Sequence, residues 1–210
     1  VELCELNFKK CFEDNVLTAK IISEVCGKYK VKLIYISSDQ VYSGKGPHSE
    51  LKFKPLNNYG ISKLLAEKYA LNNHGVVLRV NFVGKNKKKK TFHDQVIFFK
   101  KKKIILYKNI FFSPLHISTL TELISNNIFK LRPGVYNLGS KNKISKSNFI
   151  KLLCKLVNIK KKFIIQNYSN KNVLRPLDMS MNISKINKVS KVNFDVNNEI
   201  YKLANEYKKN

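Results

Sequence analysis

Short apolar runs alternate with amphipathic segments along the first 84 residues of the chain. Residues 31–38 (VKLIYISS) and 75–84 (GVVLRVNFVG) are continuous β-branched runs, typical of buried strands. Residues 12–25 and 58–73 carry apolar side chains at helical spacing, so we predict helices there. Because strand, helix and strand follow one another, the pattern favours a parallel sheet covered by helices.

The pattern changes after Gly84, where shorter elements are interrupted by lysine-rich segments. We predict helices over residues 91–99, 115–129, 149–157 and 198–207, and short strands over 103–107, 134–138 and 161–166. Ser145 or Ser147 is expected to cap the helix at 149–157.

Composition excludes several classes of protein. No run approaches the roughly 20 apolar residues of a membrane span, and the N-terminus does not have the pattern of a signal peptide. The four cysteines lack metal-like spacing, so we expect reduced thiols, no metal site and a cytoplasmic location. Neither a GxSxG elbow nor a P-loop is present.

The formal net charge of +26 raises the question of nucleic-acid binding. Only three of the 40 basic residues are arginines, although specific base and phosphate contacts favour arginine. The lysines gather in homopolymer runs at 87–90, 100–103 and 160–162, which suit solvated faces and loops. We therefore expect no specific nucleic-acid partner, while a surface that attracts a charged substrate stays open.

Three residues form the candidate catalytic group. Tyr59 and Lys63 are four apart within the predicted helix 58–73 and so share a face. Ser38 ends the preceding predicted strand, and ligands of an open α/β sheet bind beyond the carboxyl ends of its strands. Reducing a carbonyl with hydride leaves an oxyanion, which a phenol can protonate. A nearby ammonium lowers the pKa of that phenol. A serine hydroxyl can hold the same oxygen by a hydrogen bond.

The Tyr-x-x-x-Lys spacing is common by chance in a sequence rich in tyrosine and lysine, but the sequence segments around it are more specific. They are ISSDQVYSG at 36–44, PLNNYGISKLLAEKY at 55–69 and VLRVNFVG at 77–84. In this order they resemble the extended short-chain dehydrogenase/reductase family, in particular its branch of dTDP-4-dehydrorhamnose reductases and NAD-dependent nucleotide-sugar epimerases. The segments VELCE, FSPLHISTL, GVYNLGS and LRPLDMSMN extend the resemblance from Val1 to about Asn182.

The resemblance implies a role for each matching residue. Tyr59 would be the general acid/base and would also contact the cofactor. Lys63 would tune Tyr59 and bind the nicotinamide ribose, and Ser38 would polarise the C4 carbonyl or hydroxyl of the sugar. The remaining roles are cofactor contact for Asn15 and substrate contact for Asp39, Phe82 and Arg175. The implied cofactor is NADPH or NADH, and the implied partner is a nucleotide-sugar substrate, with no membrane association. A homodimer is compatible with the resemblance.

The implied fold is α/β: a partial Rossmann-type, doubly wound parallel sheet without its first βαβ units, plus a smaller C-terminal substrate-binding α+β part. Residues 1–84 would be the Rossmann portion, and 85–210 mainly the substrate-binding region, with about 114–138 packing back on the Rossmann part. The sequence contains no glycine-rich dinucleotide loop and starts with Val, so we expect an N-terminally truncated chain that binds dinucleotide weakly and is inactive alone.

The function expected first is NAD(P)H-dependent reduction of a nucleotide-linked 4-keto-deoxysugar in sugar-nucleotide and polysaccharide biosynthesis. A 4-epimerase or dehydratase of the same family shares the candidate residues, although Gln40 after Asp39 weakens the dehydratase alternative. A non-catalytic binding or regulatory member would suit the missing cofactor loop. A basic nucleic-acid-binding protein is supported by charge alone.

Overall fold

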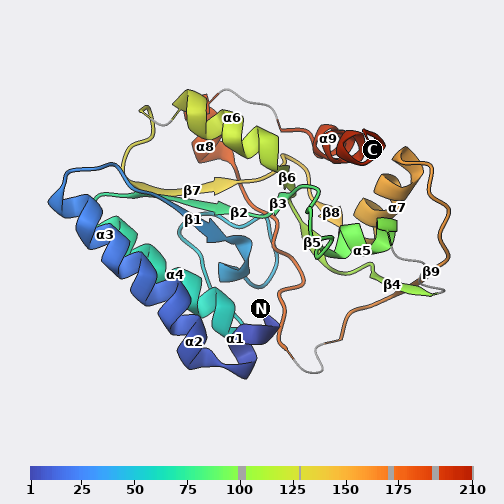
Figure 1. The fold of residues 1–210 in the computed structure, drawn as a ribbon, viewed down its shortest axis with the longest axis horizontal. Helices are drawn as coiled ribbons and strands as arrows, with labels where there is room; N and C mark the ends of the chain where they lie inside the picture. Colours follow the sequence, from blue (N-terminus) through green and yellow to red (C-terminus); the bar gives the residue numbers. More distant parts are fainter. Residues whose placement is uncertain (99–102, 128, 170–172, 191–193, 210) are drawn as a thin grey trace.

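The computed structural model describes residues 1–98, 103–127, 129–169, 173–190 and 194–209. The centre of the described fold is a three-stranded parallel sheet in the order β1 (Ile34–Ser38), β2 (Val76–Val80) and β7 (Gly134–Leu138) (Figure 1). All five residues of β2 are buried, as expected for a central strand covered on both faces.

Helices cover both faces of this sheet. On one face α3 (Thr18–Lys28) packs on α4 (Asn58–Asn72), and α4 contacts both β1 and β2. On the other face α6 (Ile117–Asn127) and α8 (Ser184–Ser190) lie over β2 and β7 (Figure 1). The predicted Rossmann-type, doubly wound arrangement is therefore confirmed.

The N-terminal helix is longer than the predicted range 12–25. After α1 (Glu2–Leu6), the chain runs through α2 (Phe8–Phe12), a π-helical turn (Glu13–Leu17) and α3 without leaving helical structure. The Asn15 side chain donates a hydrogen bond of 3.1 Å to the Cys11 carbonyl within this widened turn. The apolar spacing of residues 12–25 was interpreted as one regular helix, so the prediction placed no π-helical turn in it.

Residues after Gly84 build a second core beside the sheet. There β4 (Ile104–Tyr107) pairs in parallel with β9 (Phe163–Gln166), and β5 (Phe111–Phe112) pairs antiparallel with β8 (Ile144–Ser145). The helices α5 (Phe92–Phe98), α7 (Lys146–Leu156) and α9 (Val196–Lys208) supply buried apolar residues to this core. Figure 1 shows these helices grouped on the side away from α3 and α4.

One of the two expected helix caps is present, and two further segments differ from the sequence prediction. Ser145 caps α7 by accepting a hydrogen bond of 3.2 Å from the Asn148 amide, as one of the two expected alternatives. The start of the predicted helix 115–129 was wrong, because β6 (Leu115–His116) pairs with β3 (Phe82–Val83) before α6 begins. The helix α8 was not predicted, since its segment mixes lysine, asparagine and isoleucine.

A few predicted positions, in the helices 91–99 and 115–129 and in the lysine run 100–103, lie outside the described residues: 99, 100–102 and 128. Within the described part, no helix has the length and apolar character needed to cross a bilayer.

Candidate functional site

A cavity of about 360 Å³ opens at the carboxyl ends of β1 and β2. The structure brings five of the seven predicted site residues to its wall, namely Ser38, Asp39, Tyr59, Lys63 and Phe82. This position is where ligands bind in open parallel sheets.

The end of β1 presents Ser38 and Asp39 to this cavity. Both side chains are buried, and the Ser38 hydroxyl donates a 3.3 Å hydrogen bond to Asp39 Oδ1. Asn81, which follows β2, donates a 2.6 Å hydrogen bond to the other Asp39 oxygen. Burial raises the pKa of Asp39, and the bond from Asn81 opposes that shift. The carboxyl group is thus held firmly beside the serine hydroxyl.

Tyr59 lies in the first turn of α4, half-buried in the cavity wall. Burial raises the pKa of its phenol, a hydrogen bond with Ser38 lowers it, and the nearby Asp39 raises it again. The net shift is upward, whereas the sequence led us to expect a lowered pKa. Desolvation outweighs the favourable contacts in this structure, so the phenol keeps its proton near neutral pH.

Lys63 lies one helical turn beyond Tyr59 on the same helix. Its ammonium donates a 2.7 Å hydrogen bond to the Ile36 carbonyl and lies 4.3 Å from the centre of the Tyr35 ring. Burial lowers the pKa of this lysine to about 8, while the Glu67 carboxylate opposes the shift. The ammonium is therefore anchored on β1, and Lys63 lines the same cavity as the predicted serine.

Phe82 is 53 % exposed on the rim of the cavity, so it is not a core residue. An exposed aromatic ring at the mouth of a polar cavity can pack against the apolar face of a ligand.

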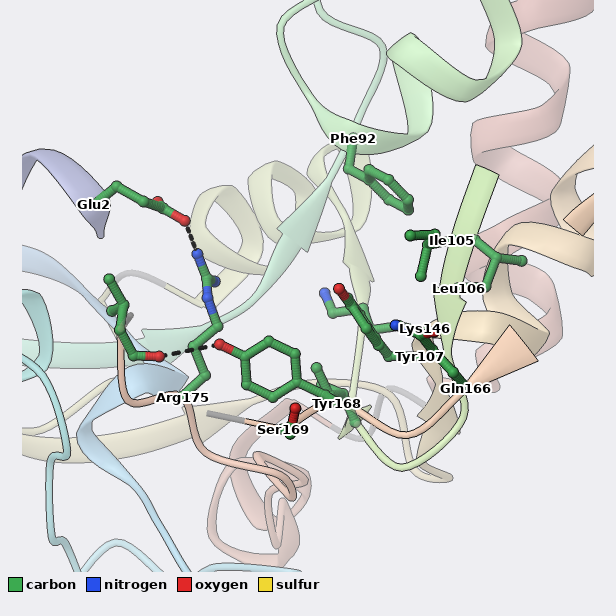
Figure 2. Close-up of a pocket in the computed structure, with 12 residues that line it drawn as sticks. Glu2, Phe92, Ile105, Leu106, Tyr107, Lys146, Gln166, Tyr168, Ser169 and Arg175 are labelled. Atoms are coloured by element: carbon green, nitrogen blue, oxygen red, sulfur yellow. Dashed lines mark hydrogen bonds and ion pairs between the residues drawn. The ribbon is translucent and has the colours of Figure 1, made fainter. Parts of the chain in front are cut away.

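Arg175 lines a second cavity, of about 760 Å³, whose wall includes residues of α1, β4 and β9. Figure 2 shows its guanidinium extended toward Glu2, with which it forms an ion pair, and shows Tyr107, Lys146 and Tyr168 around the same space. Burial lowers the pKa of Lys146 to about 8, and its charge interacts with Asp39 of the first cavity and with Arg175. Lys146 therefore belongs to the wall of the second cavity, and its pKa is also affected by the charge of Asp39.

Asn15 is not brought to the wall of the first cavity. Its amide nitrogen lies 3.1 Å from the Cys11 carbonyl oxygen and 3.5 Å from Cys11 Sγ. Cys11, to which Asn15 is hydrogen-bonded, contributes to the raised pKa of Tyr59.

Sequence reasoning missed two asparagines that organise the site. Asn57 caps α4 by accepting a 2.8 Å hydrogen bond from the Gly60 amide, and its own amide donates to Gln40 and to the Leu174 carbonyl. Asn81 orients Asp39 as described above. The capping preference and the position just beyond a strand would have signalled Asn57 and Asn81 respectively.

The helix that carries Tyr59 approaches the loop after β1 closely at Gly60. A Cβ added there would collide with the Gln40 carbonyl oxygen and lie 3.0 Å from Pro55 Cβ. Backbone atoms cannot move aside as a flexible side chain can. Only glycine therefore allows α4 to start against this loop.

We expect Gly60→Ala to lower the free energy of unfolding by about 1–3 kcal/mol through overpacking. Gly27→Ala is the matched control, since a Cβ at this other helical glycine meets only the end of the Asn73 side chain. Urea denaturation of both variants checks this. Equal stability of the Gly60 variant and the unmodified protein would contradict the close approach.

A buried ion pair fixes the sheet-facing side of α4. Arg79 donates hydrogen bonds of 2.9 and 2.6 Å to the two oxygens of Glu67, and both side chains are 2 % exposed. Ser37 donates a 2.5 Å hydrogen bond to Glu67, and Tyr42 accepts one of 2.8 Å from Arg79. This network ties α4 to β1 and β2, and so sets where Tyr59 and Lys63 lie relative to Ser38.

Among the described residues, no group of three or more His, Cys, Asp or Glu side chains is placed to hold a metal ion. The site is thus built from a phenol, an ammonium, a hydroxyl and a buried carboxyl at the end of a parallel sheet.

A Rossmann-type sheet with a tyrosine and a lysine on the helix after a serine-ended strand defines the class of short-chain dehydrogenases/reductases. The model of the RmlD substrate binding domain matches residues 1–208, and the chain belongs to this family. The resemblance stated from the sequence is thereby confirmed. No curated protein matches the chain by sequence.

Solved structures share this fold. The dTDP-4-dehydrorhamnose reductase of Yersinia enterocolitica is 22 % identical with a TM-score of 0.87, over 99 % of this chain and 77 % of that one. The reductase of the same name from Bacillus anthracis, in complex with NADP, is 20 % identical with a TM-score of 0.84, over 91 % of this chain and 72 % of that one. The dTDP-glucose 4,6-dehydratase of Bacillus anthracis, in complex with NAD, is 20 % identical with a TM-score of 0.77, over 95 % of this chain and 69 % of that one.

Proposed function

We propose that this protein carries out the NAD(P)H-dependent reduction of a nucleotide-linked 4-keto-deoxysugar in sugar-nucleotide biosynthesis. The observation that carries the proposal is the convergence of Ser38, Tyr59 and Lys63 on one cavity at the carboxyl ends of β1 and β2. Membership of the RmlD substrate binding domain family supports the same chemistry.

The described residues fit the nicotinamide end of NADPH or NADH. The Lys63 ammonium and the Tyr59 phenol lie on one wall of the cavity and can donate hydrogen bonds to the hydroxyls of a ribose. When bound, the dinucleotide supplies the hydride. Asn15 is hydrogen-bonded to Cys11, and Cys11 affects the pKa of Tyr59. We therefore assign Asn15 an indirect part in cofactor contact.

Ser38 and Tyr59 would act together on the carbonyl oxygen of the sugar. The serine hydroxyl donates a hydrogen bond that holds and polarises this oxygen. The phenol, which burial keeps protonated, gives its proton to the same oxygen as negative charge develops there. Lys63 steadies the phenolate that is left, because its ammonium lies one turn away on the same helix face.

We assign the sugar to Asp39 and Phe82, and the diphosphate to Arg175 together with Lys146. Asp39 accepts hydrogen bonds from sugar hydroxyls, and the exposed ring of Phe82 packs on the sugar face. The guanidinium fork of Arg175 matches phosphate geometry, and Lys146 lines the same cavity.

We also propose that residues 1–84 are the Rossmann portion and that residues 85–210 are mainly substrate-binding. The pairing of β7 with β2 supports including about 114–138 with the Rossmann part. The four cysteines are free thiols, which is compatible with the proposed cytoplasmic location.

The second candidate is a nucleotide-sugar 4-epimerase or dehydratase, favoured by the similarity of fold to the Bacillus anthracis dehydratase. The test incubates the protein as its gene encodes it with a panel of dTDP- and UDP-linked 4-keto sugars and NADPH or NADH, and in parallel with the corresponding 4-hydroxy sugars and NADP or NAD. Stoichiometric cofactor oxidation with formation of the 4-hydroxy sugar supports the reductase. Product formation without net oxidation favours the second candidate, and cofactor-independent sugar binding alone favours a non-catalytic member.

The pH dependence of the reaction should report the lowered pKa of Lys63. Because this pKa is about 8, the ammonium is present below that pH and is lost as the pH rises through it. We therefore expect kcat/KM for the cofactor to fall above about pH 8, since kcat/KM reports groups of the free enzyme. Lys63→Arg keeps its charge at every pH. An alkaline limb that persists in this variant would assign the titration to another group.

A further inference from the structure

Tyr35 lies on β1, three residues before Ser38, and contacts the proposed catalytic lysine. The Lys63 ammonium lies 4.3 Å from the centre of its ring and donates a 2.7 Å hydrogen bond to the carbonyl of the neighbouring Ile36. The Tyr35 hydroxyl is buried and makes no hydrogen bond with any described residue. The ring of this tyrosine is therefore engaged, while its hydroxyl is not.

We propose that Tyr35 is a positioning residue, whose ring face holds the Lys63 ammonium on β1. The consequence of this contact for catalysis rests on the proposed function. A lysine ammonium on a four-carbon stem is mobile and has three donors. The Ile36 carbonyl takes one donor and the electron-rich ring faces the cation, so the ammonium is fixed and a donor stays available to the cavity.

The other charged groups near Lys63 do not replace this contact. Glu67, on the same helix, is bound by Arg79 and Ser37. The remaining titratable groups act at the Tyr59 end of the site, and they are Asp39 after β1, Cys4 of α1 and Cys11 of α2. The ring of Tyr35 and the Ile36 carbonyl are thus the two described contacts from the sheet side that face the ammonium itself.

Three variants separate the ring from the hydroxyl and from simple bulk. Tyr35→Phe keeps the ring, whereas Tyr35→Leu removes it while keeping apolar volume. The control is Tyr69→Leu, because Tyr69 is also half-buried but lies on α4. Lys63 ionisation is followed by competitive acetic anhydride labelling of amines across pH, read by mass spectrometry of the peptide that contains Lys63.

We expect Tyr35→Leu to lower the pKa of Lys63 by roughly 0.5–1 unit, because the charged form loses its cation–π partner. Tyr35→Phe and Tyr69→Leu should titrate like the unmodified protein. Because leucine leaves a void that can disturb folding, phenylalanines with one to three ring fluorines at position 35 serve as a second series. They keep the ring volume and weaken its negative face, so the pKa of Lys63 should fall stepwise.

In the active protein, Tyr35→Leu should raise KM for the cofactor about 3- to 10-fold while KM for the sugar stays unchanged. A Lys63 pKa that ignores both the leucine and the fluorine series overturns the proposal, and so does an effect of Tyr35→Phe equal to that of Tyr35→Leu. Labelling needs no turnover. If the unmodified protein reduces no 4-keto sugar, the proposed function fails while the role of Tyr35 is still decided.

Discussion

Tyr59→Phe is expected to lower kcat for reduction of a 4-keto sugar by about 10²–10⁴-fold. The substitution removes the hydroxyl and leaves the half-buried ring that lines the cavity. Without the Tyr59 hydroxyl, the sugar oxygen has no comparable proton donor. Cofactor affinity should fall far less than kcat, because Lys63 and the shape of the cavity remain when one hydrogen bond from Tyr59 to the ribose is lost. Steady-state kinetics and cofactor titration by fluorescence check both parts.

Tyr69→Phe is the matched control for this loss. Tyr69 is also half-buried on α4 but is not part of the wall of the first cavity. Turnover by this variant should match that of the unmodified protein. Should Tyr59→Phe keep turnover within about threefold, well short of the loss expected from removing a general acid, Tyr59 would not be that acid.

Breaking the buried ion pair that anchors α4 should have the largest effect on stability. We expect Glu67→Gln or Arg79→Met to lower the free energy of unfolding by about 3–5 kcal/mol, because each leaves an uncompensated buried partner. Glu67→Gln also weakens the hydrogen bond from Ser37. Urea denaturation measures the change.

Two comparisons make this expectation specific. Glu24→Gln removes one partner of the exposed pair between Lys20 and Glu24, and should change stability by less than about 1 kcal/mol. The double variant of Glu67→Gln with Arg79→Met should cost much less than the sum of the single variants, since the two residues form one unit. Additive costs would show that the pair does not act as the anchor of α4.

The main sheet and its first helices follow from the sequence because their apolar patterns are strong. The predicted strands 31–38 and 134–138 contain β1 and β7, and the predicted helix 58–73 contains α4 with a difference of one residue. The start of 115–129 could not be predicted, because β6 is a strand only through its pairing with β3. Local pattern carries no information on that tertiary contact.

The gathering of Ser38, Tyr59 and Lys63 was also accessible from the sequence, since strand ends and helix faces follow fixed geometry. The direction of the Lys63 side chain was not, because it depends on packing against Tyr35 and on the Ile36 carbonyl. The upward pKa of Tyr59 likewise depends on burial, which spacing alone does not give. The pattern gave no sign that Lys146 would line the second cavity.

The most direct measurement follows the hydride itself. The protein as its gene encodes it is incubated with a dTDP-linked 4-keto sugar and NADPH that carries deuterium on the carbon that delivers hydride. Mass spectrometry and NMR of the product should locate one deuterium on the sugar carbon that bore the carbonyl, and Tyr59→Phe should nearly abolish this transfer. A product without deuterium at that carbon, or undiminished transfer in the variant, would contradict reduction at this site.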